Sequence, residues 1–215
     1  GDHRDLHLSI RRQRQMCIRD RSSGGAAAAL ASGLCTLSQG SDGGGSIRIP
    51  SNFCGVYGIK PTLGRIPIYK SEDAVFVQNQ LGQPGPMSRT VLDSALLLQI
   101  LSGPDPIDPG SLRSSPPDFV AATIADVSGI RIGWSSDYGY ASVDKNVLEV
   151  TSKAAQTFEE LGCVIDPVDF SVGEPFDAFW NIFCANGFTR FGYLLDADTD
   201  ILTDYSRASL EHGLS

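Results

Sequence analysis

Histidine and cysteine are scarce in this chain of 215 residues, and their scarcity narrows the chemistry available to it. The three histidines are His3, His7 and His212, so a serine–histidine–aspartate triad has no good candidate base. The five cysteines form no CxxC pair and no metal-ligand spacing. We therefore expect free thiols in a reducing cytoplasm rather than disulfides. We expect no metal or organic cofactor.

Long apolar runs and a basic charge balance are also absent. No run approaches the roughly 20 apolar residues that span a membrane, and the opening residues lack the apolar segment and cleavage site of a signal peptide. The formal net charge of −8 argues against nonspecific nucleic-acid binding through a basic surface. With 41% hydrophobic residues, the chain is long enough for one domain with a core. We expect no membrane or nucleic-acid partner, and the oligomeric state is left open.

Residues 1–21 differ in composition from everything that follows. Six arginines and three aspartates give this leader a net charge of +3, whereas the remainder of the chain carries −11. The leader has no sustained amphipathic period, and its MCIRDR string resembles translated sequencing-adapter read-through. We expect a non-native or disordered leader. The alternative is a natural basic arm that binds a partner.

Two serine sites, Ser22–Ser23 and Ser46, organise the stretch from Ser22 to Thr62. The glycines and alanines after Ser23 predict a helix over 24–34, and residues 36–41 predict a strand. Such a helix advances about 16 Å, and such a strand returns about 20 Å. If the strand folds back antiparallel to the helix, Ser46 lies beside Ser22 and the two serines form one site.

Three glycines, Gly43, Gly44 and Gly45, directly precede Ser46. Without Cβ atoms the backbone can turn tightly and aim consecutive N–H groups at one point. An anion that develops on a carbonyl oxygen attacked by Ser46 would meet these donors, as in an oxyanion hole. A phosphate-binding nest is the weaker alternative, because no GK[ST] sequence follows and no GxGxxG sequence follows a strand.

At these residues the chain resembles the amidase signature family of serine hydrolases. The resembling segments are SSGG at 22–25, GSDGGGSIRIP at 40–50, FCGVYGIKPT at 53–62 and GPMSRT at 85–90. The resemblance implies hydrolysis of a small-molecule carboxamide by a Ser–Ser–Lys triad. In that triad Ser46 is the nucleophile, which forms an acyl-enzyme, and Ser22 is the bridging serine.

The resemblance also assigns the residues around the nucleophile. Gly43, Gly44 and Gly45 match the oxyanion loop, although the family usually has Thr or Ile where Gly43 stands. Asp42 and Arg48, which alone could be solvated charges, would pair and hold this loop.

The lysine of the triad has no counterpart here. In the family it lies well upstream of the SSGG motif, and residues 1–21 contain no lysine. Lys60 belongs to the KPT motif, so we do not assign it as the base. We interpret residues 22–215 as a partial amidase domain that lacks the N-terminal part with the lysine and the C-terminal part. This fragment is expected to be inactive.

Two other functions stay open. The glutamine amidase subunit of the aminoacyl-tRNA amidotransferase has the same fold and uses glutamine as ammonia donor. It typically has Gln where Ile49 stands and a Phe-Ala-Ser-Ser-Leu-Asp-Gln stretch before the GP of the last motif, which is absent here. A free-standing amidase is therefore favoured. The second alternative is a noncatalytic fragment or binding module, because the lysine is missing.

The remaining pattern predicts the α/β class, with a mixed sheet flanked by helices. Thr90 and Asp93 resemble a capping box, and the leucine-rich helix that follows over 91–101 is expected to be buried. A strand, a helix capped by Asp144 and a second strand predict a parallel pair with a crossover helix. Strands are expected over 56–60, 130–134 and 163–168, irregular structure over 64–83 and a loop from 103 to 117. A helix is expected over 176–195, interrupted at Gly187 and Gly192 and with Trp180, Phe183 and Phe188 in the core. A last helix is expected from residue 200.

Overall fold

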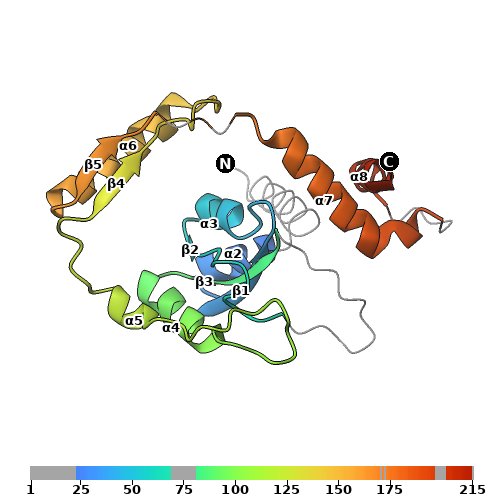
Figure 1. The fold of residues 1–215 in the computed structure, drawn as a ribbon, viewed down its shortest axis with the longest axis horizontal. Coiled ribbons are helices and arrows are strands. Elements are labelled where there is room, and N and C mark those ends of the chain that lie inside the picture. Colours follow the sequence, from blue (N-terminus) through green and yellow to red (C-terminus); the bar gives the residue numbers. More distant parts are fainter. Residues whose placement is uncertain (1–22, 69–80, 170, 172, 197–201, 215) are drawn as a thin grey trace, which may run out of the picture. The chain divides into compact units, whose positions relative to one another are not determined.

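A computed structural model of the chain describes residues 23–68, 81–169, 171, 173–196 and 202–214 (Figure 1). The described residues form two compact units, which divide between Ala125 and Asp126. Both units combine helices with a small sheet, which confirms the predicted α/β class. The leader lies outside the described residues, so its predicted nature stays a prediction. In the part of the chain that is described, no helix has the length and apolar character needed to cross a bilayer.

The first unit is built on a three-stranded antiparallel sheet. Its strands are β1 (Leu37–Asp42), β2 (Tyr57–Gly58) and β3 (Gln83–Ser88), in the order β1-β3-β2. The register pairs Leu37 with Ser88 and Asp42 with Gln83. Strand β1 was predicted within one residue, and β2 is shorter than the strand predicted over 56–60.

The central strand β3 was not predicted, because it contains Pro84 and Pro86 and proline lacks the N–H of a ladder bond. The carbonyl of Pro86 accepts a hydrogen bond from the N–H of Ile59, so the backbone polar groups of Pro86 point toward β2. Those of Pro84, two residues earlier in the strand, point the same way. Strand β2 is only two residues long. The missing donors therefore fall where little ladder exists, while β1 pairs along the whole of β3.

Helices cover this sheet and enclose a small core. They are α2 (Gly24–Ala31), α3 (Arg48–Cys54) and α4 (Val91–Leu101), and the short helix α5 (Phe119–Ala122) packs on α4. Four side chains from α2, from the turn before α3 and from β3 are fully buried together: Ala27, Leu30, Ile47 and Met87. Helix α2 ends before the predicted position, and Gly33 after it has the left-handed φ of +74° that favours glycine at a helix end.

Helix α4 begins and ends where the sequence predicts. The Thr90 hydroxyl accepts a hydrogen bond from the Asp93 N–H at 3.1 Å, which confirms the helix cap. The predicted burial is wrong for much of the helix. Ser94, Ala95 and Leu98 are buried, but the apolar side chains on other sides are exposed, among them Leu92, Leu96 and Ile100. A leucine-rich circumference predicts burial only where other elements pack on every side.

The second unit contains the predicted strand–helix–strand arrangement. Strands β4 (Arg131–Trp134) and β5 (Val164–Pro167) are parallel and are joined by α6 (Lys145–Glu160). The carboxylate of Asp144 caps α6 by accepting the N–H of Asn146 at 2.8 Å. The parallel pairing lies in this sheet and the antiparallel pairing in the sheet of the first unit.

The last helices pack on each other. Helix α7 (Phe176–Phe191) continues into a 3₁₀ turn (Gly192–Leu194), and α8 (Asp204–Leu214) packs against it with Cys184 and Leu210 buried. Gly187 lies inside α7 and does not interrupt it, whereas Gly192 marks its end. Trp180 stacks on Phe176 and Phe183, but Phe183 is 40% exposed, so its interpretation as a core residue is wrong.

Candidate active site

The loop between β1 and α3 carries Ser46, the predicted nucleophile. Strand β1 ends at Asp42, three glycines follow, and the helical turn begins at the N–H of Ile49, which donates to the carbonyl of Gly45 at 2.8 Å. The Ser46 residue is partly buried, directly before the fully buried Ile47. Among the described residues, no hydrogen bond engages the Ser46 hydroxyl. A serine at the start of a helix, after a tight turn, presents its hydroxyl beside several backbone N–H groups.

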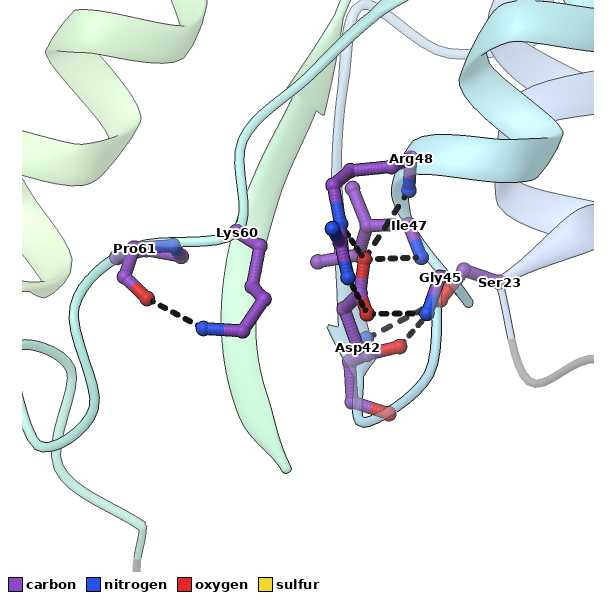
Figure 2. Close-up of polar contacts among 8 residues, drawn as sticks. Ser23, Asp42, Gly45, Ile47, Arg48, Lys60 and Pro61 are labelled. Carbon is purple, nitrogen blue, oxygen red and sulfur yellow. Dashed lines mark hydrogen bonds and ion pairs between the residues drawn. The ribbon is translucent and has the colours of Figure 1, made fainter. Parts of the chain in front are cut away.

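Asp42 holds the loop together from inside. Its side chain is fully buried, and its two oxygens accept five hydrogen bonds (Figure 2). Oδ1 accepts the N–H of Gly45 at 2.6 Å, and Oδ2 accepts the N–H groups of Ile47 at 3.3 Å and Arg48 at 3.2 Å. The guanidinium of Arg48 adds Nε to Oδ2 at 2.9 Å and Nη2 to Oδ1 at 3.0 Å. The predicted pairing of Asp42 with Arg48 is confirmed.

These bonds favour the charged form of the carboxylate. Burial alone acts to raise the pKa of Asp42. The side-chain bonds from Arg48 and the backbone N–H groups of Gly45 and Arg48 outweigh it and lower the pKa from 3.8 to about 2. The bond to Asp42 raises the pKa of Arg48 in turn, against the opposing effect of partial burial. The loop is therefore fastened by an ion pair that stays charged at neutral pH.

The three glycines differ in what the backbone requires of them. Gly45 has a φ of +104°, and a Cβ there would approach Cδ1 of Ile49 to 2.5 Å. Gly43 has no such constraint, because a Cβ there would meet only ordinary contacts, the nearest being Cα of Gly82 at 3.6 Å. A position that accepts a side chain fits the family's usual Thr or Ile at Gly43. Glycine is required at position 45 and is optional at position 43.

The backbone N–H groups of the three glycines differ in whether they are already hydrogen-bonded within the loop. The N–H of Gly45 donates to Asp42, so it supports the loop rather than an external anion. No hydrogen-bond acceptor for the N–H groups of Gly43 and Gly44 occurs within the described ranges. The predicted oxyanion donors are thereby reduced from three glycines to Gly43 and Gly44, and their role stays a prediction.

The predicted return of β1 along α2 is supported by hydrogen bonds between the end of the strand and the helix. At its start, the hydroxyl of the buried Ser23 accepts the N–H of Ser41 at 3.1 Å and donates to the carbonyl of Ser41 at 3.3 Å. Gly40 permits this approach, because a Cβ there would lie 2.5 Å from the Ser23 Oγ. Ser22 lies outside the described residues, so its distance to Ser46 stays a prediction.

Lys60 binds the backbone of its neighbour in the KPT motif. Its Nζ donates to the carbonyl of Pro61 at 3.1 Å, and Figure 2 shows its side chain directed at Pro61 and away from Asp42 and Gly45. The interpretation that leaves Lys60 out of the triad stays a prediction.

The supporting bonds of three residues could not be found from the sequence, because their partners are distant in the chain. The Ser23 hydroxyl binds a residue 18 positions away. Gln83 is fully buried, accepts the N–H of Gly64 at 2.7 Å and donates to the carbonyl of Ile66 at 3.1 Å, which ties the segment after the KPT motif to β3. Arg89 donates to two carbonyls more than 50 positions away. Only the position of Arg89 inside the GPMSRT motif could have drawn attention to it.

The cysteines conform in part to the prediction of buried free thiols. Among the cysteines of the described residues, Cys35, Cys163 and Cys184 are free; Cys163 and Cys184 are buried, and Cys35 and Cys54 are half-buried. Burial raises the pKa of the Cys184 thiol. None of these cysteines lies in the loop that carries Ser46.

Comparison with known proteins gives a consistent result. A family model described as Amidase matches residues 21–214. An acylamidase of Rhodococcus erythropolis is 43% identical over 175 residues, which are 81% of this chain and 36% of that protein. The matching subunit of the glutamyl-tRNA(Gln) amidotransferase of Bacillus velezensis is 44% identical over 147 residues, 68% of this chain and 30% of that protein.

Comparison with solved structures also finds an amidase signature enzyme. A crystal structure of a bacterial aryl acylamidase of the amidase signature enzymes is similar with a TM-score of 0.77 and 33% identity, covering 88% of this chain and 40% of that one. This chain thus spans well under half the length of these relatives.

Proposed function

Because the chain belongs to the amidase signature family, we propose that the protein hydrolyses the C–N bond of a small carboxamide through an acyl-enzyme formed on Ser46. One observation carries this proposal. Ser46 follows a turn that Asp42 fastens with five hydrogen bonds, while the N–H groups of Gly43 and Gly44 have no acceptor in the described part of the chain. A serine beside uncommitted backbone donors in a rigid loop is the arrangement that acyl transfer requires.

The proposed reaction has two halves. Ser46 Oγ bonds to the carbonyl carbon, and its proton passes through Ser22 to a neutral lysine, while Gly43 and Gly44 donate to the developing oxyanion. The C–N bond then breaks, and the amine leaves with the proton. In the second half water attacks the ester, its proton follows the same path, and the acid is released as Ser46 is restored. The lysine is implied by family membership, and residues 1–21 contain none.

Asp42 and Arg48 have a supporting role in this proposal. The buried carboxylate fixes the N–H groups of Gly45, Ile47 and Arg48 on one side of the loop. Fixing those three peptide groups limits how the peptides of Gly43 and Gly44 can turn. Preorganised donors cost no rearrangement when charge develops on the substrate oxygen.

The experiment uses the complete protein that contains residues 22–215 with its lysine segment. Ser46→Ala should abolish turnover of simple amides without unfolding the protein, because the covalent step is lost and little cavity is made. Ser22→Ala should slow turnover strongly. Ser114→Ala, at an exposed serine in a loop of the same unit, is the matched control. Added hydroxylamine should divert the acyl group to a hydroxamate. Full activity of the Ser46→Ala variant would refute the nucleophile assignment.

A second candidate is the glutamine-hydrolysing subunit of a tRNA-dependent amidotransferase. The 44% identity to the Bacillus velezensis subunit favours it, and Ile49 in place of the usual Gln argues against it. Glutaminase activity that rises with the partner subunits and tRNA, with no turnover of simple amides, would select this candidate. A folded complete protein inactive on both amides and glutamine would favour the noncatalytic alternative. A cytoplasmic location is part of the proposal, supported by the free thiols.

A further inference from the structure

Helix α2 has little local stabilisation of its own. It spans only eight residues, far fewer than the roughly 12 to 15 that isolated helices need. Its N-cap residue, Ser23, makes no capping bond, because its hydroxyl binds the backbone of Ser41 instead. The first turn has no acidic residue, and the last turn has no basic residue. The place of α2 must therefore be set by contacts with other elements.

Two polar contacts hold α2 at its two ends. Ser23 joins the start of the helix to the end of β1. At the other end, Nη1 of Arg89 donates to the carbonyl of Leu30 at 3.1 Å and to the carbonyl of Cys35 at 2.8 Å. Leu30 lies in the last turn of α2, and Cys35 lies two residues before β1 begins. A cation at this end of the helix also interacts favourably with the negative end of the helix dipole.

Arg89 is well placed for this role because of the sheet register. It directly follows Ser88, which pairs with Leu37 at the start of β1. Its backbone is thus fixed at the same end of the sheet as the C-terminal end of α2. This places the GPMSRT motif against the helix that follows the SSGG motif, although the two are about 60 residues apart in the chain.

We propose that Arg89 is a positioning residue for the proposed active site. It joins the C-terminal end of α2 and the turn before β1 to the end of β3, and so helps set the place of the helix and of Ser23 at its start, the residue that directly follows Ser22 in the chain. The effect on catalysis rests on the proposed function of Ser22. The effect on the place of α2 does not depend on that function. The proposed role of Arg89 is exerted through its bonds to the end of α2 and the turn after it.

The structural half is tested on the 215-residue chain by hydrogen exchange of backbone amides. Arg89→Met keeps most of the aliphatic stem and removes both donations. It should speed exchange of the amides of residues 27–34 about three- to tenfold, because Arg89 is an exposed residue and hydrogen bonds at exposed sites are modest. Arg89→Lys should lie between Met and wild type, since an ammonium can still donate to one carbonyl. Arg113→Met, at an exposed arginine of the same unit, should change nothing.

The functional half is tested in the complete enzyme. Arg89→Met should lower kcat with KM nearly unchanged, because a misplaced bridging serine slows proton transfer without altering substrate contacts. Arg89→Lys should recover part of kcat. Unchanged exchange in α2, or equal acceleration throughout β1, β3 and α4, would overturn the proposal. Faster exchange in α2 with an unaltered kcat would also overturn it. An inactive wild-type enzyme would refute the proposed function instead, and the exchange experiment would still decide the role of Arg89 in α2.

Discussion

The pairs Asp42–Arg48 and Asp166–Arg131 join the same two residue types by two guanidinium hydrogen bonds each, yet their surroundings differ. The Asp42 side chain is 0% exposed and also accepts three backbone N–H groups. The Asp166 side chain is 39% exposed, and its arginine is 75% exposed. Desolvation makes the first carboxylate dependent on its partners, whereas water can replace the partners of the second. Surroundings, not chemical type, decide what each pair contributes.

The comparison also separates the two units. The Asp42 network lies in the first unit and fastens a loop that no regular ladder supports. The Arg131–Asp166 bridge lies in the second unit and spans two strands already joined by backbone hydrogen bonds. Both tryptophans, Trp134 and Trp180, belong to the second unit. Tryptophan fluorescence therefore follows the second unit, and hydrogen exchange resolves the first.

The largest effect is expected from Asp42→Asn. An amide at this position turns an NH₂ group toward N–H donors and leaves Arg48 without its anion. We expect unit 1 to lose about 3 kcal/mol, measured by hydrogen exchange of β1 and α3. The tryptophan unfolding transition should stay in place. Asp166→Asn is the matched control. A similar loss from both substitutions would mean that burial does not distinguish the pairs.

The next effect is the pH dependence that Asp42 gives to the first unit. Its pKa is lowered from 3.8 to about 2 in the folded chain, so the stabilisation is complete above pH 3.8 and is lost as the pH falls through 2. This linkage amounts to about 2 kcal/mol. Hydrogen exchange and denaturant unfolding between about pH 5 and about pH 2 should show a steeper loss in wild type than in Asp42→Asn. Parallel curves for the two proteins would contradict the assignment.

The pairing of Asp42 with Arg48 could be predicted from sequence because both flank one short loop. Helix α4 could also be predicted, because its cap at Thr90 is a local signal. Strand β3 could not, because its prolines argue against a strand and its partner β1 is remote in the chain. The long-range bonds of Ser23 and Arg89 were missed for the same reason: a hydroxyl or guanidinium gives no sign of a distant carbonyl.

Burial was the least predictable property. The leucines of α4 and the apolar positions of α6 follow helical patterns, but Leu96, Val147 and Val150 are exposed. A pattern fixes which side chains share a face, and only the neighbouring elements decide whether that face is covered. The sequence also could not show which of Gly43, Gly44 and Gly45 needs a positive φ and which donates its N–H within the loop. Both are properties of the folded loop.

A smaller effect should separate two glycines of the loop that Asp42 fastens. Gly45→Ala forces a Cβ into a left-handed backbone and against Ile49, so we expect a loss of about 1–3 kcal/mol in unit 1. Gly43→Ala meets only ordinary contacts and should be neutral or stabilising by about 0.4–1 kcal/mol. Denaturant titration with hydrogen exchange in β1 and α3 measures both. A larger loss at position 43 than at position 45 would contradict the backbone analysis.

The smallest effect is expected from the exposed bridge itself. Arg131 and Asp166 lie diagonally across β4 and β5, where Arg131 pairs with Val164 and Gly133 pairs with Asp166. Both side chains keep contact with water, so Arg131→Ala and Asp166→Ala should each cost at most about 1 kcal/mol. Tryptophan fluorescence reports this unit directly, because Trp134 ends β4. Added salt should remove most of the difference, since screening weakens exposed pairs. A salt-resistant loss of several kcal/mol would mean that this bridge is as dependent on its partners as Asp42, and the contrast between the two pairs would fail.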